Sequence, residues 1–310
     1  RISSRVKFRL ALTGTPISNA PIDAYGIYRA IDPRIFGSVF YAFRNRYAVM
    51  GGYQQKQVVA YKNMEEFKEK LHSVAYRVTK AECLDLPDML DTYRYFKLEP
   101  SAARLYGDMR RDAVAELDSG KTVTAVNVLA KLLRLSQIAG GFLDGQKVSS
   151  AKMELLDDLL GDLLDDPDKK VVIFHRFTLE GAEIEASLKA RRKVGYVRID
   201  GSTPMADRGT HVERFQSDTS CRVFLGQIQT VGLGLTLTAA DTAIFYSCDF
   251  SYSNLEQAMS RLHRSGQRNP VTNIFLVADG TVDQKILAAL QAKRDLAATI
   301  IDEWRDIFIC

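Results

Sequence analysis

Two arginines near the end of this sequence have the spacing and chemistry of an anion-binding pair. Arg261 and Arg264 lie three residues apart in QAMSRLHRSGQ (257–267), a stretch with a helical apolar pattern. Residues three apart on a helix project to the same side, and planar guanidinium groups suit phosphate oxygens better than ammonium groups do. A solvated basic face is the ordinary alternative. The phosphate interpretation predicts that the pair neutralises charge on a transferring phosphoryl group.

The predicted helix that carries these arginines has boundary signals at both ends. Ser253 is followed three residues later by Glu256, which matches a capping box. Gly266 suits the left-handed position that follows a helix. We therefore expect a helix over residues 254–264 with both arginines on one face.

Polar or glycine-rich segments follow four predicted strands. The strands are expected at 171–174, 196–199, 222–226 and 242–246. Ligands of open parallel sheets bind at the carboxyl ends of the strands. Each segment alone has an ordinary explanation, such as a turn or, for a lone histidine, a structural role. Together they predict a binding site formed by His175, Arg176, Ser202, Thr203, Gly232, Gly234 and the stretch SCDFSYS (247–253).

The elements that must position these residues alternate regularly in the second half of the chain. A fifth strand is expected at 271–277, and helices at 152–164, 178–192, 205–216 and 281–304. This alternation predicts an α/β fold with a parallel sheet flanked by helices on both faces.

The first half of the chain lacks such alternation. Strands are expected only at 5–12 and 74–79, and helices at 100–117 and 124–139. The best linker candidate is DLPD (85–88), because a proline disfavours helix in the residue before it.

Composition and charge restrict the class of protein. The 310 residues are 46% hydrophobic and 26% charged, which is typical of a globular protein with room for two domains. The apolar runs are too short for a membrane span. Residues 1–150 hold 23 basic against 15 acidic residues, whereas residues 151–310 hold 19 against 23, so the first half could face a polyanion. Four widely spaced cysteines without a C-x-x-C pair predict neither a zinc site nor disulfides, and favour an intracellular protein.

The sequence lacks the motifs that hold ATP phosphates and magnesium. AELDSGKT (115–122) ends like a phosphate-binding loop, but Ala115 replaces the first glycine and a helical pattern precedes it. A D-E-x-H box is also absent. The chain starts with arginine, not methionine, which suggests a piece of a longer protein.

Six segments together resemble the Swi/Snf-type ATPases, superfamily-two motors that translocate on double-stranded DNA. In order, they are LTGTPISN (12–19), RVTK (77–80), VVIFHRFT (171–178), RIDGST (198–203), GLGLTLTAAD (232–241) and QAMSRLHRSGQ (257–267). The resemblance implies two RecA-like lobes with ATP between them. It also implies that this sequence begins at motif III of lobe one and includes all of lobe two. The implied divisions are the end of lobe one with a helical protrusion (1–84), a linker with a second protrusion (85–150) and lobe two (151–310).

The resemblance also implies roles for individual residues. Arg264, as arginine finger, and Arg261 would act on the nucleotide in motif VI, and Gln257 would anchor the same network. Motif V and motif III would couple the nucleotide to the DNA, and two further segments would touch the DNA backbone. The coupling residues are Gly232, Gly234, Thr13, Gly14 and Thr15, and the DNA-contacting residues are His175, Arg176, Ser202 and Thr203. Val231 and Thr236 depart from the motif V pattern, where the family has glycine and asparagine.

The expected function is the C-terminal half of a DNA-dependent ATPase. The full-length protein would use ATP and Mg²⁺, held mainly by lobe one, and would bind double-stranded DNA independently of sequence, through phosphates. The isolated chain is expected to be inactive, because it lacks the phosphate-binding loop. No metal site of its own and no membrane association are expected, while other protein subunits stay an open alternative.

Two other functions compete with this one. The first is a non-enzymatic nucleic-acid-binding module that completes a partner's site. The second, a dinucleotide-dependent enzyme, is ranked last, because the sequence has no G-x-G-x-x-G after a strand. The expected location is cytoplasmic in a bacterial or viral setting and nuclear in a eukaryotic one.

Overall fold

The computed structural model describes residues 6–14, 16–17, 19–51, 57–76, 78, 80–118, 125–192, 194–231 and 234–302. The chain forms two compact units. One contains residues 1–82, 251–253 and 289–310, and the other contains residues 83–250 and 254–288. The larger unit includes residues 85–150 and most of residues 151–310, whereas residues 251–253 and 289–310, expected in the second lobe, are grouped with the smaller unit. The expected division into lobes and protrusions stays a prediction.

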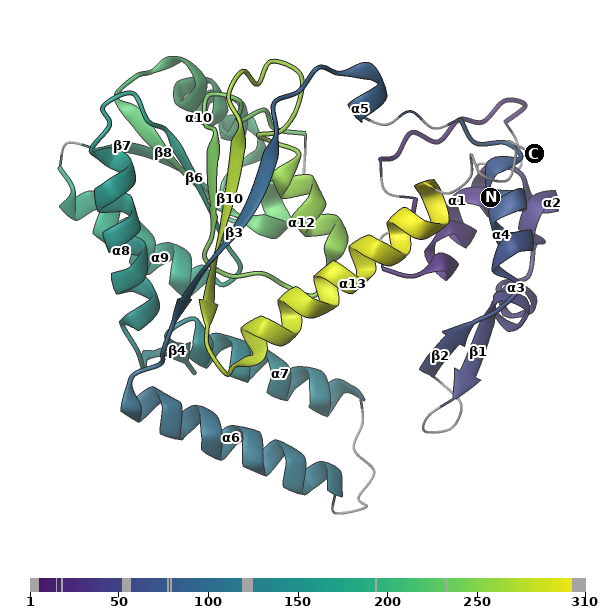
Figure 1. Ribbon diagram of the computed structural model, residues 1–310, viewed down its shortest axis with the longest axis horizontal. Helices are drawn as coiled ribbons and strands as arrows, with labels where there is room; N and C mark the ends of the chain where they lie inside the picture. Colours follow the sequence, from purple (N-terminus) through teal and green to yellow (C-terminus); the bar gives the residue numbers. More distant parts are fainter. Residues whose placement is uncertain are drawn as a thin grey trace. The chain divides into compact units, whose positions relative to one another are not determined.

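A six-stranded parallel sheet forms the centre of the larger unit, in the order β3-β10-β9-β6-β8-β7 (Figure 1). Its strands are β3 (Met89–Phe96), β6 (Val171–His175), β7 (Gly195–Ile199), β8 (Cys221–Gln227), β9 (Thr242–Phe245) and β10 (Val271–Ala278). The five strands expected in the second half of the sequence are confirmed. The edge strand β3 was missed, because tyrosines, an arginine and an aspartate interrupt any simple apolar alternation in MLDTYRYF.

Helices connect and follow these strands, with bounds close to those expected except for α12. They are α6 (Pro100–Asp118), α7 (Ala125–Ala139), α8 (Ala151–Leu164), α9 (Thr178–Ala190), α10 (Met205–Ser217), the short α11 (Ile228–Val231), α12 (Tyr252–Met259) and α13 (Val282–Asp302). A two-stranded hairpin of β4 (Phe142–Leu143) and β5 (Gln146–Lys147) separates α7 from α8. The apparent phosphate-binding loop begins in α6, and its last residues lie outside the described ones. None of the described helices combines the length and apolarity needed to cross a bilayer.

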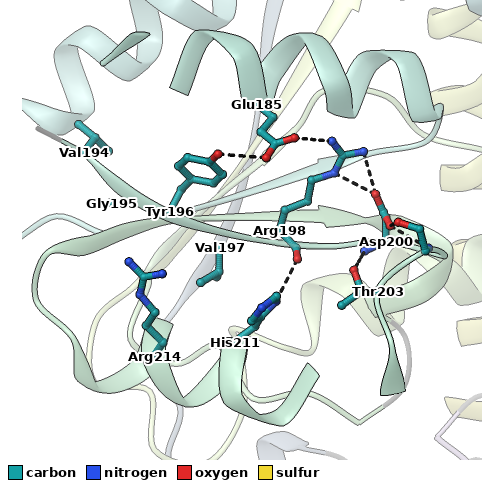
Figure 2. A pocket seen from close by; sticks show the side chains of 11 residues that line it. Glu185, Val194, Gly195, Tyr196, Val197, Arg198, Asp200, Thr203, His211 and Arg214 are labelled. Carbon is teal, nitrogen blue, oxygen red and sulfur yellow. Dashed lines mark hydrogen bonds and ion pairs between the residues drawn. The ribbon is translucent and has the colours of Figure 1, made fainter. Parts of the chain in front are cut away.

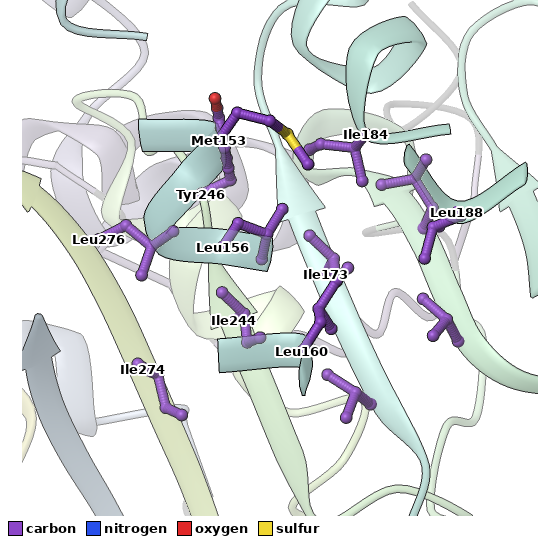
Figure 3. Packing of buried hydrophobic residues seen from close by; sticks show 13 residues of the cluster. Met153, Leu156, Leu160, Ile173, Ile184, Leu188, Ile244, Tyr246, Ile274 and Leu276 are labelled. Atoms are coloured by element: carbon purple, nitrogen blue, oxygen red, sulfur yellow. The ribbon is translucent and has the colours of Figure 1, made fainter. Parts of the chain in front are cut away.

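Aliphatic side chains fill one face of the sheet. Leu156 and Leu160 of α8 and Ile184 and Leu188 of α9 pack on Ile173 in β6, and all five are almost fully buried (Figure 3). Each of these side chains contributes about 1.5–3 kcal/mol when it leaves water. This burial holds α8 and α9 against the strands whose ends carry the candidate site.

Aromatic rings cross the opposite face in register. Phe174 in β6, Phe245 in β9, Phe275 in β10 and Tyr93 in β3 are paired neighbours, with ring centroids 4.7–5.4 Å apart. Phe215 of α10 packs on Phe224 of β8 on the same face. Such pairs contribute beyond the area they bury, and here they fix the register of four strands.

The smaller unit is a helical cluster with an aromatic core. Its elements are a 3₁₀ turn (Pro21–Asp23), α1 (Ala24–Ile31), α2 (Pro33–Phe36), α3 (Phe40–Tyr47), a hairpin of β1 (Ala48–Gly51) and β2 (Gln57–Tyr61), and α4 (Met64–His72), with α5 (Lys80–Cys83) at the boundary between the units. Phe36 lies at its centre, and the ring centroids of Tyr28, Phe43, Tyr47 and Phe67 lie 5.1–5.7 Å from its own.

The strands expected at 5–12 and 74–79 are wrong for the described residues of those segments. They carry no strand assignment and pair with no other described strand. Phe8, Leu10, Leu12 and Tyr76 are largely exposed. The apolar pattern is real, but a strand also needs a neighbouring strand for its backbone hydrogen bonds.

Two glycines within helices of the larger unit allow a matched test of the packing of α9 against the end of β6. A Cβ at Gly181 in α9 would lie 2.4 Å from the His175 ring, whereas a Cβ at Gly161 in α8 would meet nothing within 4 Å. Gly161→Ala should stabilise the protein by about 0.5–1 kcal/mol. Gly181→Ala should destabilise it by about 1–3 kcal/mol, because the buried ring must move. Urea denaturation measures both, and a stabilised Gly181→Ala variant would refute the packing described here.

Candidate functional site

The loop after β6 holds the first candidate residues. His175 ends the strand with its ring fully buried, and its Nδ1 lies 3.0 Å from the backbone oxygen of Phe177. Its Nε2 has no hydrogen-bond partner among the described residues. Burial lowers the pKa of His175 to about 4, against the opposing effect of that hydrogen bond. The expected direct contact of His175 with DNA does not fit this burial, because glycine at position 181 lets the ring pack inward.

Arg176, the next residue, is partly exposed. Its guanidinium carbon lies 4.9 Å from the centre of the Phe177 ring. Its backbone N–H donates to the hydroxyl of Ser247, in the loop after β9, at 2.8 Å. Arg176 is therefore the more exposed residue of this pair, although its Nη1 is buried and has no hydrogen-bond partner among the described residues.

The loop after β7 is a compact turn around Asp200. The carboxylate accepts hydrogen bonds from the backbone and hydroxyl of Ser202 at 2.8 and 2.6 Å, and pairs with Arg198 at 2.7 Å. The hydroxyl oxygen of Thr203 instead accepts a hydrogen bond from the backbone N–H of Asp200 at 3.0 Å. Burial raises the pKa of Asp200, but the Ser202 hydrogen bonds and Arg198 outweigh it and the net shift is downward. The turn thus presents Ser202 and Thr203 in a fixed geometry.

Gln227, at the end of β8, joins the loops after β6 and β7. Its Nε2 donates to the backbone oxygen of Arg176 at 3.1 Å, and its Oε1 accepts from the backbone N–H of Gly201 at 3.2 Å. Thr230 of α11 also donates to that oxygen at 3.4 Å. Sequence reasoning missed this residue, since a single glutamine within a polar loop has no distinguishing pattern.

An open groove of about 660 Å³ lies along the edge strand β7, between α9 and α10 (Figure 2). Arg198 crosses it between Glu185, at 2.8 Å, and Asp200. His211 of α10 lies 3.1 Å from the Arg198 backbone oxygen, which covers part of the exposed strand edge. Because its central cation is already paired with two carboxylates, we assign the groove no anion-binding role.

The helix expected over 254–264 is shorter than expected. It begins at Tyr252, so Ser253 is not its cap, and it ends at Met259. Arg261 and Arg264 lie in the turns that follow, not on one helical face. Leu262 is fully buried, and the buried Gln267 side chain donates to the backbone oxygens of Ala240 and Leu262 at 2.8 and 3.3 Å. These tertiary contacts end the helix early. The positive φ of Gly266 is as expected.

Both arginines are half-buried against the loop after β8. The Arg261 backbone oxygen accepts from the Leu237 N–H at 2.9 Å, and Arg264 Nη1 donates to the Leu235 oxygen at 3.3 Å. Burial and the neighbouring charge of Arg264 lower the pKa of the Arg261 guanidinium. Two cations held within electrostatic range of each other favour binding of an anion. Gln257 lies half-buried on α12, in the segment that leads to them.

The structure therefore separates the candidate residues into two groups. Arg176, Ser202 and Thr203 lie at the carboxyl ends of β6 and β7. The arginine segment, residues 261–264, lies near the amino end of β3 instead, because His263 Nε2 is 2.8 Å from the backbone oxygen of Pro87. Residues 228–241 run from the first group to the second, because they begin at the end of β8 and end at the start of β9.

The remaining candidates are exposed or outside the described residues. Gly234 has a φ of 77°, so its backbone conformation, not a close approach, requires glycine. Thr13 and Gly14 are exposed in the smaller unit. Gly232 and Thr15 lie outside the described residues. Within the described ranges, no group of three or more histidine, cysteine or acidic side chains is arranged to hold a metal ion.

The buried histidine predicts a specific pH dependence of stability. Because its pKa in the folded protein is about 4, against about 6.5 when unfolded, its contribution is complete above pH 6.5 and is lost as the pH falls towards 4. The full effect is about 3 kcal/mol. Urea denaturation at pH 5 and 7.5 should show a smaller loss at pH 5 for His175→Asn than for the wild type. Equal pH dependence in both proteins would contradict this assignment.

Comparison with protein families gives two matches. Residues 2–140 match the SNF2-related domain, and residues 151–266 match the helicase conserved C-terminal domain. Among solved structures, the Sulfolobus solfataricus SWI2/SNF2 ATPase core in complex with dsDNA is 28% identical, with a TM-score of 0.57 over 95% of this chain and 63% of that one. The C-terminal part of the Fun30 ATPase domain shares the fold at 18% identity, with a TM-score of 0.55, over 71% of this chain and 99% of that one.

Curated relatives match nearly the whole chain. The DNA repair and recombination protein RAD54-like of Drosophila mojavensis is 27% identical over 96% of this chain and 43% of its own length. The DNA annealing helicase and endonuclease ZRANB3 of Bos taurus is 28% identical over 97% of this chain and 28% of its own length. The chain thus spans less than half the length of these relatives. They are eukaryotic, so the cytoplasmic location expected in a bacterial or viral setting has no support among them.

The parallel sheet with its flanking helices has the RecA-like α/β fold of SWI2/SNF2 ATPase C-terminal domains. The chain belongs to the Swi/Snf-type family of helicase-like ATPases, with an SNF2-related domain followed by a helicase conserved C-terminal domain.

Proposed function

We propose that this chain is the C-terminal half of a DNA-dependent ATPase that translocates on double-stranded DNA. The observation that carries the proposal is the pair of half-buried arginines, Arg261 and Arg264, held on the loop after β8. Burial and mutual repulsion disfavour two neighbouring cations, so an anion that reaches both gains their full attraction.

The anion proposed for this pair is the terminal phosphate of ATP, bound with Mg²⁺ mainly by the other lobe. The donor set fits, because guanidinium groups bind phosphate oxygens in a planar fork and cannot lose their protons. ATP would supply the phosphoryl group that is transferred to water. Arg264, as arginine finger, would neutralise the charge that develops on that group, while Arg261 would bind and orient its oxygens. Gln257, on the helix that precedes them, would help to hold the pair.

The DNA would meet the carboxyl ends of β6 and β7. Arg176 supplies a cation there. The Thr203 hydroxyl accepts from the Asp200 N–H and keeps its own proton to donate, while Ser202, whose hydroxyl donates to Asp200, would exchange that hydrogen bond for one to a phosphate. Such groups suit phosphate oxygens, which carry no sequence information. His175 would act only by filling the space beneath Arg176. Gly234, Thr13 and Gly14 are proposed to couple nucleotide and DNA through the loops they belong to.

The arginine assignment predicts a large loss of turnover. In a form of the protein with both lobes, Arg264→Ala should lower DNA-stimulated ATP hydrolysis by about 10³–10⁵-fold, the range typical of arginine fingers. Arg192→Ala is the control, because Arg192 is exposed after α9, near the amino end of β7. Steady-state phosphate release measures both variants. Turnover within a few-fold of the wild type for Arg264→Ala would exclude the role.

The DNA assignment predicts a change in salt dependence. Each phosphate contact contributes about 0.9 to the slope of log affinity against log salt. Arg176→Gln should weaken binding to double-stranded DNA of any sequence and reduce that slope by about one. Fluorescence anisotropy between 50 and 200 mM salt would measure it, with Arg192→Gln as the control. An unchanged slope would remove Arg176 from the DNA interface.

A further inference from the structure

Glu180 supplies a buried carboxylate that contacts two loops. The loop after β6 carries Arg176 and is proposed to bind DNA, and the loop after β9 leads to the arginine segment. Glu180, in the first turn of α9, is only 1% exposed. Its Oε2 accepts hydrogen bonds from the backbone N–H groups of Arg176 at 3.2 Å and Phe177 at 3.0 Å. The same oxygen accepts from the hydroxyl of Ser247 at 2.5 Å. One carboxylate oxygen therefore binds the loop after β6 and the loop after β9 at once.

Ser247 closes this arrangement. Its hydroxyl oxygen accepts a hydrogen bond from the Arg176 N–H at 2.8 Å, and the same hydroxyl donates a hydrogen bond to Glu180 Oε2. The loop that Ser247 begins continues to Asp249, which accepts from Gln229 of α11 at 3.2 Å and from Asn254 of α12 at 2.8 Å. The helix α12 then leads directly to Arg261.

The other carboxylate oxygen faces the end of α7. A Cβ at Gly140 would lie 2.2 Å from Glu180 Oε1, so only glycine lets the backbone pass there. Oε1 has no hydrogen-bond partner among the described residues. Burial raises the pKa of Glu180, against the opposing charge of Lys152 on α8, which is itself paired with Asp283 at 2.9 Å. Burying a carboxylate this completely costs free energy unless its oxygens accept hydrogen bonds.

We propose that Glu180 is a positioning residue that couples DNA binding to ATP turnover. It holds the backbone of Arg176 against Ser247, so the position of the DNA-contacting loop fixes the loop that leads to Arg261 and Arg264. The inference rests on the proposed function. The competing explanation is a purely local one, in which Glu180 only caps the first turn of α9 by accepting the Phe177 N–H at 3.0 Å.

The test uses a form of the protein with both lobes and separates basal from DNA-stimulated hydrolysis. Glu180→Ala should raise the DNA concentration for half-maximal stimulation by about tenfold or more and lower the stimulated rate, leaving the basal rate within about twofold, because charge-assisted hydrogen bonds are lost. Glu180→Gln should retain most of the stimulation, since its amide oxygen still accepts from the two N–H groups. Glu183→Gln, on the same helix and paired with Lys147 instead, is the matched control.

Three outcomes would overturn the inference. Stimulation of Glu180→Ala could equal that of the wild type, its basal and stimulated rates could fall by the same factor, or Glu183→Gln could behave like Glu180→Ala. If Glu180→Ala does not fold, Ser247→Ala replaces it, because this change removes the hydroxyl that both Arg176 and Glu180 bind.

A second measurement distinguishes this inference from the proposed function. Amide hydrogen exchange at Arg176 and Phe177, without DNA or ATP, should be faster in Glu180→Ala and close to the wild-type rate in Glu180→Gln. Gly140→Ala should also accelerate it, but not in a Glu180→Ala background, where the clash with Oε1 is gone. A wild type without DNA stimulation would refute the proposed function and the coupling. Unchanged exchange in a DNA-stimulated enzyme would refute the positioning role alone.

Discussion

The backbone of Arg176 is hydrogen-bonded on both sides, and the arrangement of the candidate site depends on this. Its N–H is bound by Ser247 at 2.8 Å, and its C=O accepts from Gln227 at 3.1 Å. Those partners lie at the ends of β9 and β8, on either side of β6 in the sheet. Because parallel strands bring their carboxyl ends to one edge, three loops meet at a single residue, Arg176, through its two successive peptide units. Side-chain hydrogen bonds to the backbone replace the ladder bonds that stop where the strands end.

The loop after β8 differs from the loops beside it, because it connects the two groups of candidate residues. It begins at the same edge, where Gln227 binds the neighbouring loops, but it ends at the start of β9. Leu237 and Gln267 attach its far end to the arginine segment through backbone oxygens at 2.8–2.9 Å. This loop therefore joins the proposed DNA-contacting loops to the arginine segment through the described hydrogen bonds at its two ends.

The sequence predicted the sheet well and the arginine helix poorly, for reasons that particular residues explain. Buried runs such as VVIF and RVFLG have aliphatic and aromatic side chains on both faces of a parallel strand, so their pattern is independent of distant contacts. The end of α12 depends on such contacts instead. Leu262 turns inward, and Gln267 binds carbonyls from a loop about 27 residues earlier, so a helical pattern that continues to Arg264 is broken at Met259. The edge strand β3 was missed because its side chains are exposed or half-buried on both faces of the sheet, so polar residues interrupt the apolar pattern.

The site residues show the same division between pattern and environment. Motif spacing singled out Arg176, Ser202, Thr203 and the two arginines, yet it could not distinguish the partly exposed Arg176 from the fully buried His175 beside it. That difference depends on Gly181, one turn into α9, whose missing side chain makes room for the imidazole ring. The sequence pattern does not indicate the role of Glu180 either, because a glutamate in the first turn of a helix is usually a solvated residue near the helix N-terminus. Only the approach of Gly140 and Ser247 from distant parts of the chain encloses it and makes its carboxylate a link between two loops.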